Sequence, residues 1–143
     1  MEKQKVLFVC IHNSARSQMA EAFVNSYHDD KCIAESAGLE PGILNTLVVK
    51  SMSEINIDIS KNKTKDVFEF FKTGRRYDYV ITVCDEASGQ RCPIFPGALK
   101  KVSWSFEDPS SFTGTEDEKL IKIAKVRDAI KTKVEEFVNS LKV

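Results

Sequence analysis

Residues 6–17 read VLFVCIHNSARS and contain, in order, an apolar run, a polar loop and the beginning of a helix pattern. The run Val6–Val9 is continuous and rich in strand-forming residues, which is typical of a strand covered on both faces in a parallel sheet. A helix is expected to begin near Arg16 or Ser17, because apolar residues then recur every four positions along one face. This stretch therefore predicts the first strand, loop and helix of an α/β fold.

The rest of the chain alternates between strand and helix patterns. Further strands are expected at residues 31–36, 79–83 and 101–104, and further helices around residues 47–55, 67–71 and 120–141. This alternation predicts a three-layer sandwich in which a four-stranded parallel sheet, with flavodoxin-like winding, is flanked by helices. We expect residues 1–143 to form one domain. Ligands of such sheets bind beyond the carboxyl ends of the strands, where Cys10 and Cys84 are both expected.

The charge of the chain is balanced, with 21 Lys and Arg against 21 Asp and Glu. This balance gives no reason to expect a nucleic-acid or membrane surface as partner, so any bound anion must be held by a few local groups. No apolar run is long enough to span a bilayer, and the first residues, Met1–Lys5, do not resemble a signal peptide. We therefore expect a protein of the reducing cytoplasm.

Four cysteines are present, at positions 10, 32, 84 and 92. In a cytoplasmic protein they favour metal binding or redox chemistry over structural bridges. The chain has no C-x-x-C pair and its only histidines are His12 and His28, so we expect no metal site built on them. Cys32 lies in the second predicted strand and is expected to be a core residue.

The loop from Cys10 to Ser17 has the residue types that bind a tetrahedral oxyanion. A turn between a strand and a helix directs backbone N–H groups at one point, and the helix N-terminus adds its positive dipole end. The same field, with Arg16 nearby, favours the thiolate form of Cys10, and Ser14 or Ser17 can donate to the sulfur. The guanidinium of Arg16 matches two oxygens of such an anion, and Asn13 can tie the loop to its surroundings. The alternative is a buried, inert cysteine beside a surface arginine.

Residues 6–21 (VLFVCIHNSARSQMAE) resemble the signature of the low-molecular-weight protein tyrosine phosphatase superfamily, and within it the match is closer to the thioredoxin-coupled arsenate reductases. The resemblance continues through Ser36-Ala37-Gly38, Asp58-Ile59-Ser60, Val83-Cys84-Asp85, Cys92-Pro93, Trp104, Asp108-Pro109 and Val126-Arg127-Asp128. Two positions depart from it. His12 stands where relatives often carry glycine, and Ala15 where many relatives carry another cysteine.

The resemblance implies a substrate loop and a set of reacting residues. The substrate-binding residues it implies are Ile11, His12, Asn13, Ser14, Ala15, Arg16 and Ser17. Arsenate is the implied substrate, with phosphate or sulfate as analogues, and Asp108 is the implied general acid. Cys10 would attack arsenic, Cys84 would then attack the Cys10 sulfur, and Cys92 would move the disulfide to the pair of residues 84 and 92. Thioredoxin is the implied electron donor, acting on a monomeric protein without a tightly bound cofactor.

Two other functions stay open at this point. One is a tyrosine phosphatase whose cysteine pair only protects Cys10, and the other is a non-enzymatic anion or redox sensor on the same fold. Cys84 favours the reductase, because the phosphatase branch tends to have a residue without a thiol there. Ser110–Phe112 lack the tyrosine pair that usually follows the acid loop of the phosphatases, and Gln18 stands where they typically show proline. A glutathione/glutaredoxin couple remains the alternative to thioredoxin.

Potassium is a further open question. Four residues, Asn13, Glu21, Ser36 and Asp66, match positions that bind potassium in some relatives. Oxygen ligands suit such a hard cation. The same four side chains could equally form a hydrogen-bonded network.

Overall fold

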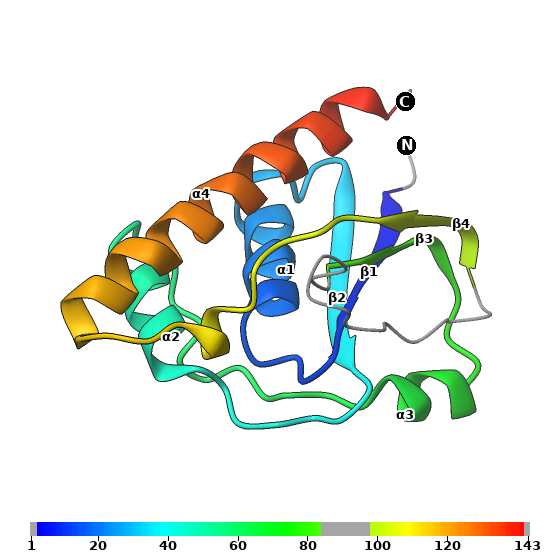
Figure 1. Ribbon diagram of the computed structural model, residues 1–143. Coiled ribbons are helices and arrows are strands. Elements are labelled where there is room, and N and C mark those ends of the chain that lie inside the picture. The colour runs from blue at the N-terminus through cyan, green and yellow to red at the C-terminus, as the bar shows by residue number, and fades with distance from the viewer. Residues whose placement is uncertain (1–2, 84–97, 142–143) are drawn as a thin grey trace.

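The computed structural model describes residues 3–83 and 98–141 of the 143-residue chain. Within these residues, four parallel strands form one sheet in the order β2-β1-β3-β4 (Figure 1). The strands are β1 (Gln4–Cys10), β2 (Cys32–Gly38), β3 (Tyr77–Thr82) and β4 (Ala98–Ser103). The predicted four-stranded parallel sheet is confirmed.

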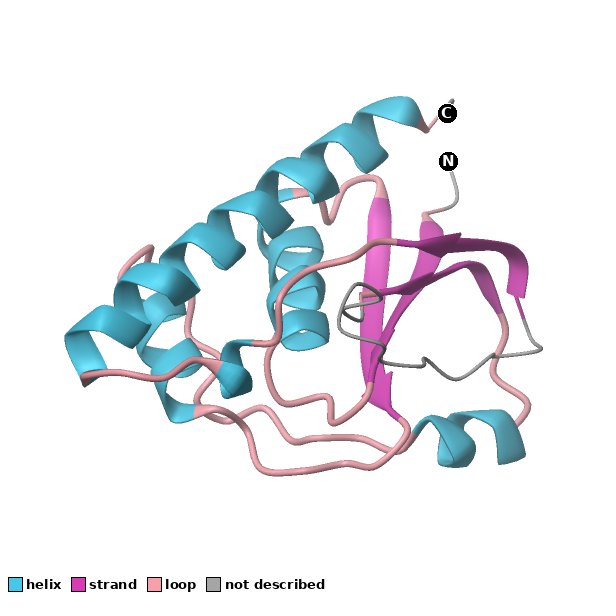
Figure 2. Cartoon of the chain, viewed as in Figure 1, coloured by secondary structure: helices cyan, strands magenta, loops and turns pink. Residues whose placement is uncertain are grey.

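Helices lie on both faces of this sheet, as Figure 2 shows by colour. They are α1 (Arg16–Tyr27), α2 (Thr46–Ser53), α3 (Val67–Lys72) and α4 (Glu116–Ser140), with a short 3₁₀ turn, η2 (Pro109–Ser111). The long helix α4 packs against both α1 and α2. The three-layer α/β sandwich expected from the alternating pattern is therefore confirmed.

The continuous apolar run of β1 serves two hydrophobic cores, because successive strand side chains point to opposite faces. Val6, Phe8 and Cys10 belong to the core that includes residues of α1 and α4. Leu7 and Val9 belong to the second core, which includes residues of α3. Burial on both faces is the physical reason why this strand reads as an uninterrupted apolar segment.

The ends of two helices extend beyond the apolar pattern that predicts them. The last helix begins at Glu116, before the first residue of its apolar stripe, because Thr115 caps it by accepting a hydrogen bond from Glu118 N at 3.2 Å. The apolar residues mark only the part of this helix that packs on the core, whereas the capping residue determines where the helix begins. In α1, Phe23 is fully buried but Tyr27 is 44% exposed, since the helix leaves the core at its last turn.

The parallel direction of the strands brings several chain segments to one edge of the sheet. Cys10 ends β1 there, and Val83, which follows β3, donates from its backbone N to Val9 O at 2.9 Å. Trp104 follows β4 and donates to Thr82 O at 2.7 Å. This edge is the one at which ligands of parallel sheets bind.

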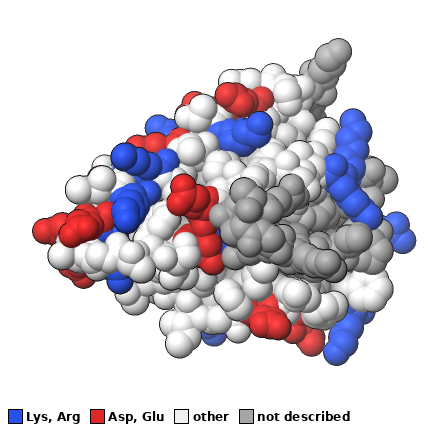
Figure 3. Space-filling view, viewed as in Figure 1, with Lys and Arg blue, Asp and Glu red and all other residues white. Residues whose placement is uncertain are grey.

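The surface carries charges of both signs. On the face shown in Figure 3, acidic and basic side chains alternate over α4, and basic side chains gather at the edge near β4. Neither sign covers that face as a continuous field. In the described ranges, no helix combines the length and the apolar character that a membrane span requires.

Candidate active site

The loop between β1 and α1, residues 11–15, is held from outside by the segment that follows β2. Residues 39–45, called here the supporting segment, donate backbone hydrogen bonds to four carbonyls: Leu39 N to Cys10 O (3.2 Å), Glu40 N to Ile11 O (2.8 Å), Gly42 N to His12 O (3.0 Å) and Asn45 N to Ser14 O (2.9 Å). A planar trans peptide directs its C=O and its N–H to opposite sides. The N–H next to the His12 carbonyl, that of Asn13, accordingly faces the Cys10 sulfur at 3.2 Å, as anion binding requires.

Gly38, the last residue of β2, lies directly against this loop. A Cβ atom added at position 38 would stand 2.7 Å from both Ile11 O and Asn13 N, which are main-chain atoms that cannot move aside separately. Only glycine allows so close an approach of two backbones. Asn13 itself adopts a positive φ of 52°, a conformation that asparagine tolerates better than most residues.

The sulfur of Cys10 lies at the centre of the loop and is almost completely buried, with 2% of the residue exposed. It accepts a hydrogen bond from Asn13 N at 3.2 Å and lies 2.8 Å from Ser17 Oγ. A main-chain N–H and a hydroxyl group therefore contact this buried sulfur directly.

The Asn13 amide connects Ser17, which lies beside the Cys10 sulfur, to the rest of the site. Lys65 N donates to Asn13 Oδ1 at 2.9 Å, and because a main-chain N–H can only donate, that atom is the amide oxygen. The amide nitrogen of Asn13 then donates to Ser17 Oγ at 2.8 Å. Ser17 Oγ keeps its own hydrogen, which it donates to the sulfur when Cys10 is a thiolate, because a thiolate can only accept. Asn13 and Ser17 thus form a relay that ends on Cys10.

Gln18 supports this relay from the fully buried side of α1. Its Nε2 lies 3.1 Å from Asn13 O, 3.0 Å from Asn13 Oδ1 and 3.0 Å from Lys63 O. Asn62 Nδ2 donates to the other amide atom, Gln18 Oε1, at 3.1 Å. From the sequence, Gln18 served only to distinguish the reductases from the phosphatases, which typically have proline at this position. A polar residue within the buried stretch of an amphipathic helix was the signal that could have indicated this supporting role.

Arg16 connects the loop with the segment that carries Asp108. Its side chain is buried, its Nη1 donates to Phe106 O at 3.2 Å, and its Nη2 lies 3.6 Å from Asp108 Oδ2. Asp108 is 18% exposed at its side chain and accepts at Oδ1 from Ser110 N at 2.9 Å, which places it at the N-terminus of η2. A carboxyl group that can move a proton therefore lies beside the guanidinium of the loop.

The N-terminus of α1 differs from those of the other described helices. The side chains of Asn45, Asp66 and Thr115 cap α2, α3 and α4, whereas α1 has no side-chain cap. Because no side chain caps this end, the positive end of the helix dipole faces the loop of Cys10 and can favour a bound anion.

The two departures from the family signature do not disturb the loop. His12 is exposed, and its Nδ1 lies 2.9 Å from Glu40 O, which can only accept, so Nδ1 carries the hydrogen of that bond. Gly42 leaves room for the imidazole, since a Cβ there would stand 3.3 Å from His12 Cβ. Ala15 is buried in the core, where a methyl group is sufficient.

The four positions that suggest potassium make contacts within the chain. Ser36 Oγ donates to Glu21 Oε2 at 2.7 Å, and the ammonium of Lys65 lies 3.5 Å from the same oxygen. Burial raises the pKa of Glu21, and the nearby charge of Lys65 opposes this rise. Asn13 Oδ1 is engaged by Lys65 N, and Asp66 Oδ1 accepts from Phe68 N at 2.8 Å. These contacts match the hydrogen-bonded network, with Lys65 supplying the positive charge, so we derive no step from a potassium ion.

The predicted site residues fall into two groups. Residues 10–17 and Asp108 lie together at the carboxyl edge of the sheet. Cys84 and Cys92 lie outside the described residues. Cys32 is in the core, as expected, and its burial raises the pKa of its thiol. It pairs with Gln4 at the start of the strands, whereas Cys10 pairs with Gly38 at their end, so the two sulfurs are separated by most of the length of the sheet.

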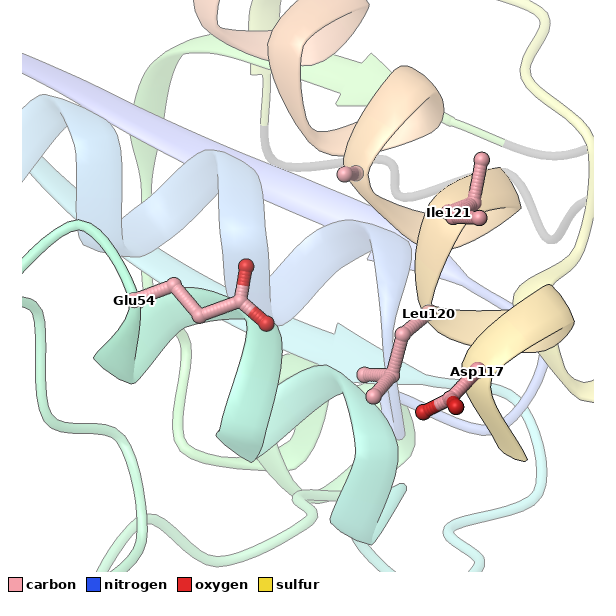
Figure 4. Close-up of a pocket in the computed structure, with 5 residues that line it drawn as sticks. Glu54, Asp117, Leu120 and Ile121 are labelled. Carbon is pink, nitrogen blue, oxygen red and sulfur yellow. The ribbon is translucent and has the colours of Figure 1, made fainter.

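A separate pocket of about 370 Å³ lies between the end of α2 and the beginning of α4 (Figure 4). Its lining residues are Glu54, Asp117, Leu120, Ile121 and Ala124. None of the predicted site residues lines this pocket, and its lining contains no thiol or hydroxyl group. It therefore takes no part in the candidate active site.

Several known proteins of similar sequence and structure are arsenate reductases. The chain is 39% identical to the arsenate reductase of Bacillus subtilis (strain 168) over 140 residues, which cover 98% of this chain and 99% of that protein. A solved arsenate reductase in the phosphate binding state superposes with a TM-score of 0.78 at 30% identity, covering 97% of this chain and 99% of the other. The thioredoxin-dependent arsenate reductase of Corynebacterium glutamicum superposes with a TM-score of 0.67 at 26% identity, covering 98% of this chain and 62% of that one.

The family itself follows from a match along almost the whole chain. The model of the low molecular weight phosphotyrosine protein phosphatase family matches residues 5–143, which include the loop of Cys10 and Arg16 as well as Asp108. The resemblance seen in residues 6–21 is thereby confirmed. The chain belongs to the low molecular weight phosphotyrosine protein phosphatase family.

Proposed function

We propose that residues 1–143 form one domain that reduces arsenate to arsenite, with Cys10 as the nucleophile. The observation that carries this proposal is the buried Cys10 sulfur, which accepts a hydrogen bond from Asn13 N and lies 2.8 Å from Ser17 Oγ in the loop before α1. The similarity to arsenate reductases over nearly the full length supports the choice of substrate.

Arsenate would bind in the loop of residues 11–17. The backbone amides and the uncapped N-terminus of α1 hold its oxygens, and Arg16 binds two of them through its planar guanidinium. The Cys10 thiolate attacks arsenic and forms a sulfur–arsenic bond. Asp108 protonates the oxygen that leaves, which departs as water.

The reduction itself would require the cysteines at 84 and 92. Cys84 attacks the Cys10 sulfur, the sulfur–arsenic bond breaks, and arsenic keeps the electron pair and leaves as arsenite. Cys92 then attacks Cys84, which frees Cys10 and leaves a disulfide between residues 84 and 92. Val83, the neighbour of Cys84 in sequence, lies beside Val9 at the edge of the sheet where Cys10 is found. This placement supports the relay.

Thioredoxin is the proposed electron donor, in a reducing cytoplasm. It would reduce the disulfide of residues 84 and 92 by thiol–disulfide exchange and return the enzyme to its starting state. The support comes from the Corynebacterium glutamicum relative, which is a thioredoxin-dependent enzyme.

The deciding experiment follows arsenate-dependent NADPH consumption in the presence of thioredoxin and thioredoxin reductase. Cys84→Ser and Cys92→Ser should each abolish this turnover while slow hydrolysis of an aryl phosphate, which needs only Cys10, survives. Cys32→Ser is the matched control and should keep both activities, because Cys32 lies at the far end of the sheet. Normal cycling of either of the first two variants would show that the relay is wrong.

A tyrosine phosphatase with a protective cysteine pair is the second candidate. The family match favours it, because the loop and the acid serve phosphate esters as well. The segment after Asp108 and Pro109 reads Ser110-Ser111-Phe112 and offers no tyrosine wall for an aromatic substrate. Efficient phosphotyrosine hydrolysis without arsenate-dependent NADPH consumption would support this candidate over the reductase.

A further inference from the structure

Asn45 makes contacts that reach beyond its role as a helix cap. Its Oδ1 accepts from Leu47 N at 3.0 Å and from Val48 N at 3.2 Å, which caps α2 and identifies this atom as the amide oxygen. The amide nitrogen therefore points the other way and donates to Ser110 Oγ at 3.3 Å. The backbone N of Asn45 donates to Ser14 O, within the substrate loop, at 2.9 Å.

Ser110 belongs to the turn that holds the proposed general acid. Its backbone N donates to Asp108 Oδ1 at 2.9 Å, so the same residue contacts Asn45 through its side chain and Asp108 through its main chain. Ser111 Oγ donates to Asp108 O at 2.6 Å and closes the turn. A continuous path of hydrogen bonds thus runs from Ser14 through Asn45 and Ser110 to the Asp108 carboxyl group.

A second path between loop and acid runs through Arg16, whose Nη2 lies 3.6 Å from Asp108 Oδ2. A bound oxyanion competes for the same guanidinium, because Arg16 is the side chain that matches its oxygens. Once the substrate is bound, the path through Asn45 does not compete with it. This path can therefore keep the acid in place during the reaction.

We propose that Asn45 is a positioning residue that holds the Asp108 turn at the substrate loop through Ser110. The inference rests on the proposed role of Asp108 as general acid. Capping alone does not explain the choice of residue, since serine and aspartate cap helices equally well. Asparagine combines a capping oxygen with a donor on the same side chain, and this donor is what reaches Ser110.

The test uses Asn45→Ser and Ser110→Ala. Serine at position 45 keeps the cap of α2 but is too short to reach Ser110, and Ser110→Ala removes the other end of the same bond while its backbone N still contacts Asp108. The reaction compared is the cleavage of phenyl phosphate and of p-nitrophenyl phosphate. Phenolate leaves poorly and needs the acid, whereas p-nitrophenolate leaves well without it.

The expected result is a selective loss. Both variants should lower kcat/KM for phenyl phosphate about two- to tenfold, the range set by one net hydrogen bond, and change p-nitrophenyl phosphate less than twofold. The double variant should lose no more than either single variant, because both remove the same bond. Asp108→Ala should show the same selectivity with a larger loss, and kcat/KM for arsenate should follow the order seen with phenyl phosphate.

Asn25→Ser is the matched control. Asn25 makes two hydrogen bonds with the backbone of Ala34 in β2 and contacts no residue of the candidate site, so its loss lowers stability without changing the ratio of the two rates. Equal losses on both esters, or no change with either, would overturn the inference. The proposed function is judged separately, since failure of the wild-type protein to consume NADPH with arsenate refutes that function whatever the ester ratio shows.

Discussion

Single residues surround the sulfur of Cys10, the proposed nucleophile. This sulfur lies 2.8 Å from Ser17 Oγ, and Ser17 Oγ accepts from the Asn13 amide, which is oriented by Lys65 N. Neither Asn13 nor Ser17 carries a formal charge. We therefore expect the reactivity of Cys10 to depend on the orientation of these two side chains as well as on Arg16. A surrounding shell of this kind is needed to keep a reacting group in place.

Ser17→Ala tests this relay. The variant leaves the buried thiolate with one donor fewer, and hydrogen bonds to charged groups contribute about 1.5–3 kcal/mol. The rate of arsenate turnover should therefore fall about ten- to a hundredfold, measured as kcat under saturating thioredoxin. Ser53→Ala, at the exposed end of α2, is the control for loss of a hydroxyl. An unchanged kcat in Ser17→Ala would mean that the bond to sulfur has no part in the reaction.

At the scale of elements, the end of β2 determines the shape of the loop after β1. The supporting segment that follows Gly38 takes up the loop carbonyls, and Gly38 itself allows the two backbones to approach. The loop is therefore built by two elements distant in sequence.

Gly38→Ala should disturb the loop without touching Cys10. The added Cβ would meet main-chain atoms at 2.7 Å, so the backbone of the loop must shift. We expect phosphate affinity, measured by calorimetry, to weaken at least tenfold, and the melting temperature to fall. Gly42→Ala is the matched variant, since its Cβ would lie 3.3 Å from the Cβ of an exposed histidine, and its effect should be much smaller. Equal affinity in both variants would contradict this account.

The sequence predicted the elements whose pattern is local. The strand Val6–Val9 and the helix from Arg16 appear where apolar runs and spacings place them, because periodicity reflects which faces are buried. The apolar stripe alone does not mark the start of α4 at Glu116, since the Thr115 cap sets this start. The contacts by which residues 39–45 support the loop after β1 could not be predicted, because a hydrogen bond between main-chain atoms does not depend on the identity of the side chains.

For the molecule as a whole, Glu21 couples the charge of one buried carboxyl group to the free energy of unfolding. It joins α1 to Ser36 in β2, and burial raises its pKa above the ordinary value of 4.5 despite the attraction of Lys65. The folded state thus holds the proton of this group more tightly than the unfolded state does. The stability that this group contributes is present at pH values below 4.5 and is lost as the pH rises through the raised pKa.

Glu21→Gln should therefore show a pH-dependent difference from the wild type. Glutamine cannot ionise, so the free energy of unfolding of the variant should improve relative to the wild type as the pH increases from about 4 to 8. Urea unfolding at both ends of this range measures the difference. Glu135→Gln, at an exposed position of α4, controls for the loss of one negative charge. A difference that stays constant with pH, or grows in the opposite direction, would contradict the direction of the shift.

The sequence by itself determined the position of the proposed nucleophile, its loop and the helix behind it. Cys10, Asn13, Arg16 and Ser17 are contiguous, and a strand followed by a turn and a helix places such neighbours around one point without help from the rest of the chain. It also indicated the parallel sheet, because a strand that is buried on both faces consists of a continuous run of apolar residues.

Only the tertiary structure decided which distant groups meet that loop. Asp108 lies beside Arg16, Lys65 N orients Asn13, and Asn45 reaches Ser110, each across a separation of more than fifty residues. Such contacts depend on how the crossovers pack and on the distance between two backbones. Hydrophobic periodicity carries no information on either, because it records the burial of a residue but not the partner that buries it.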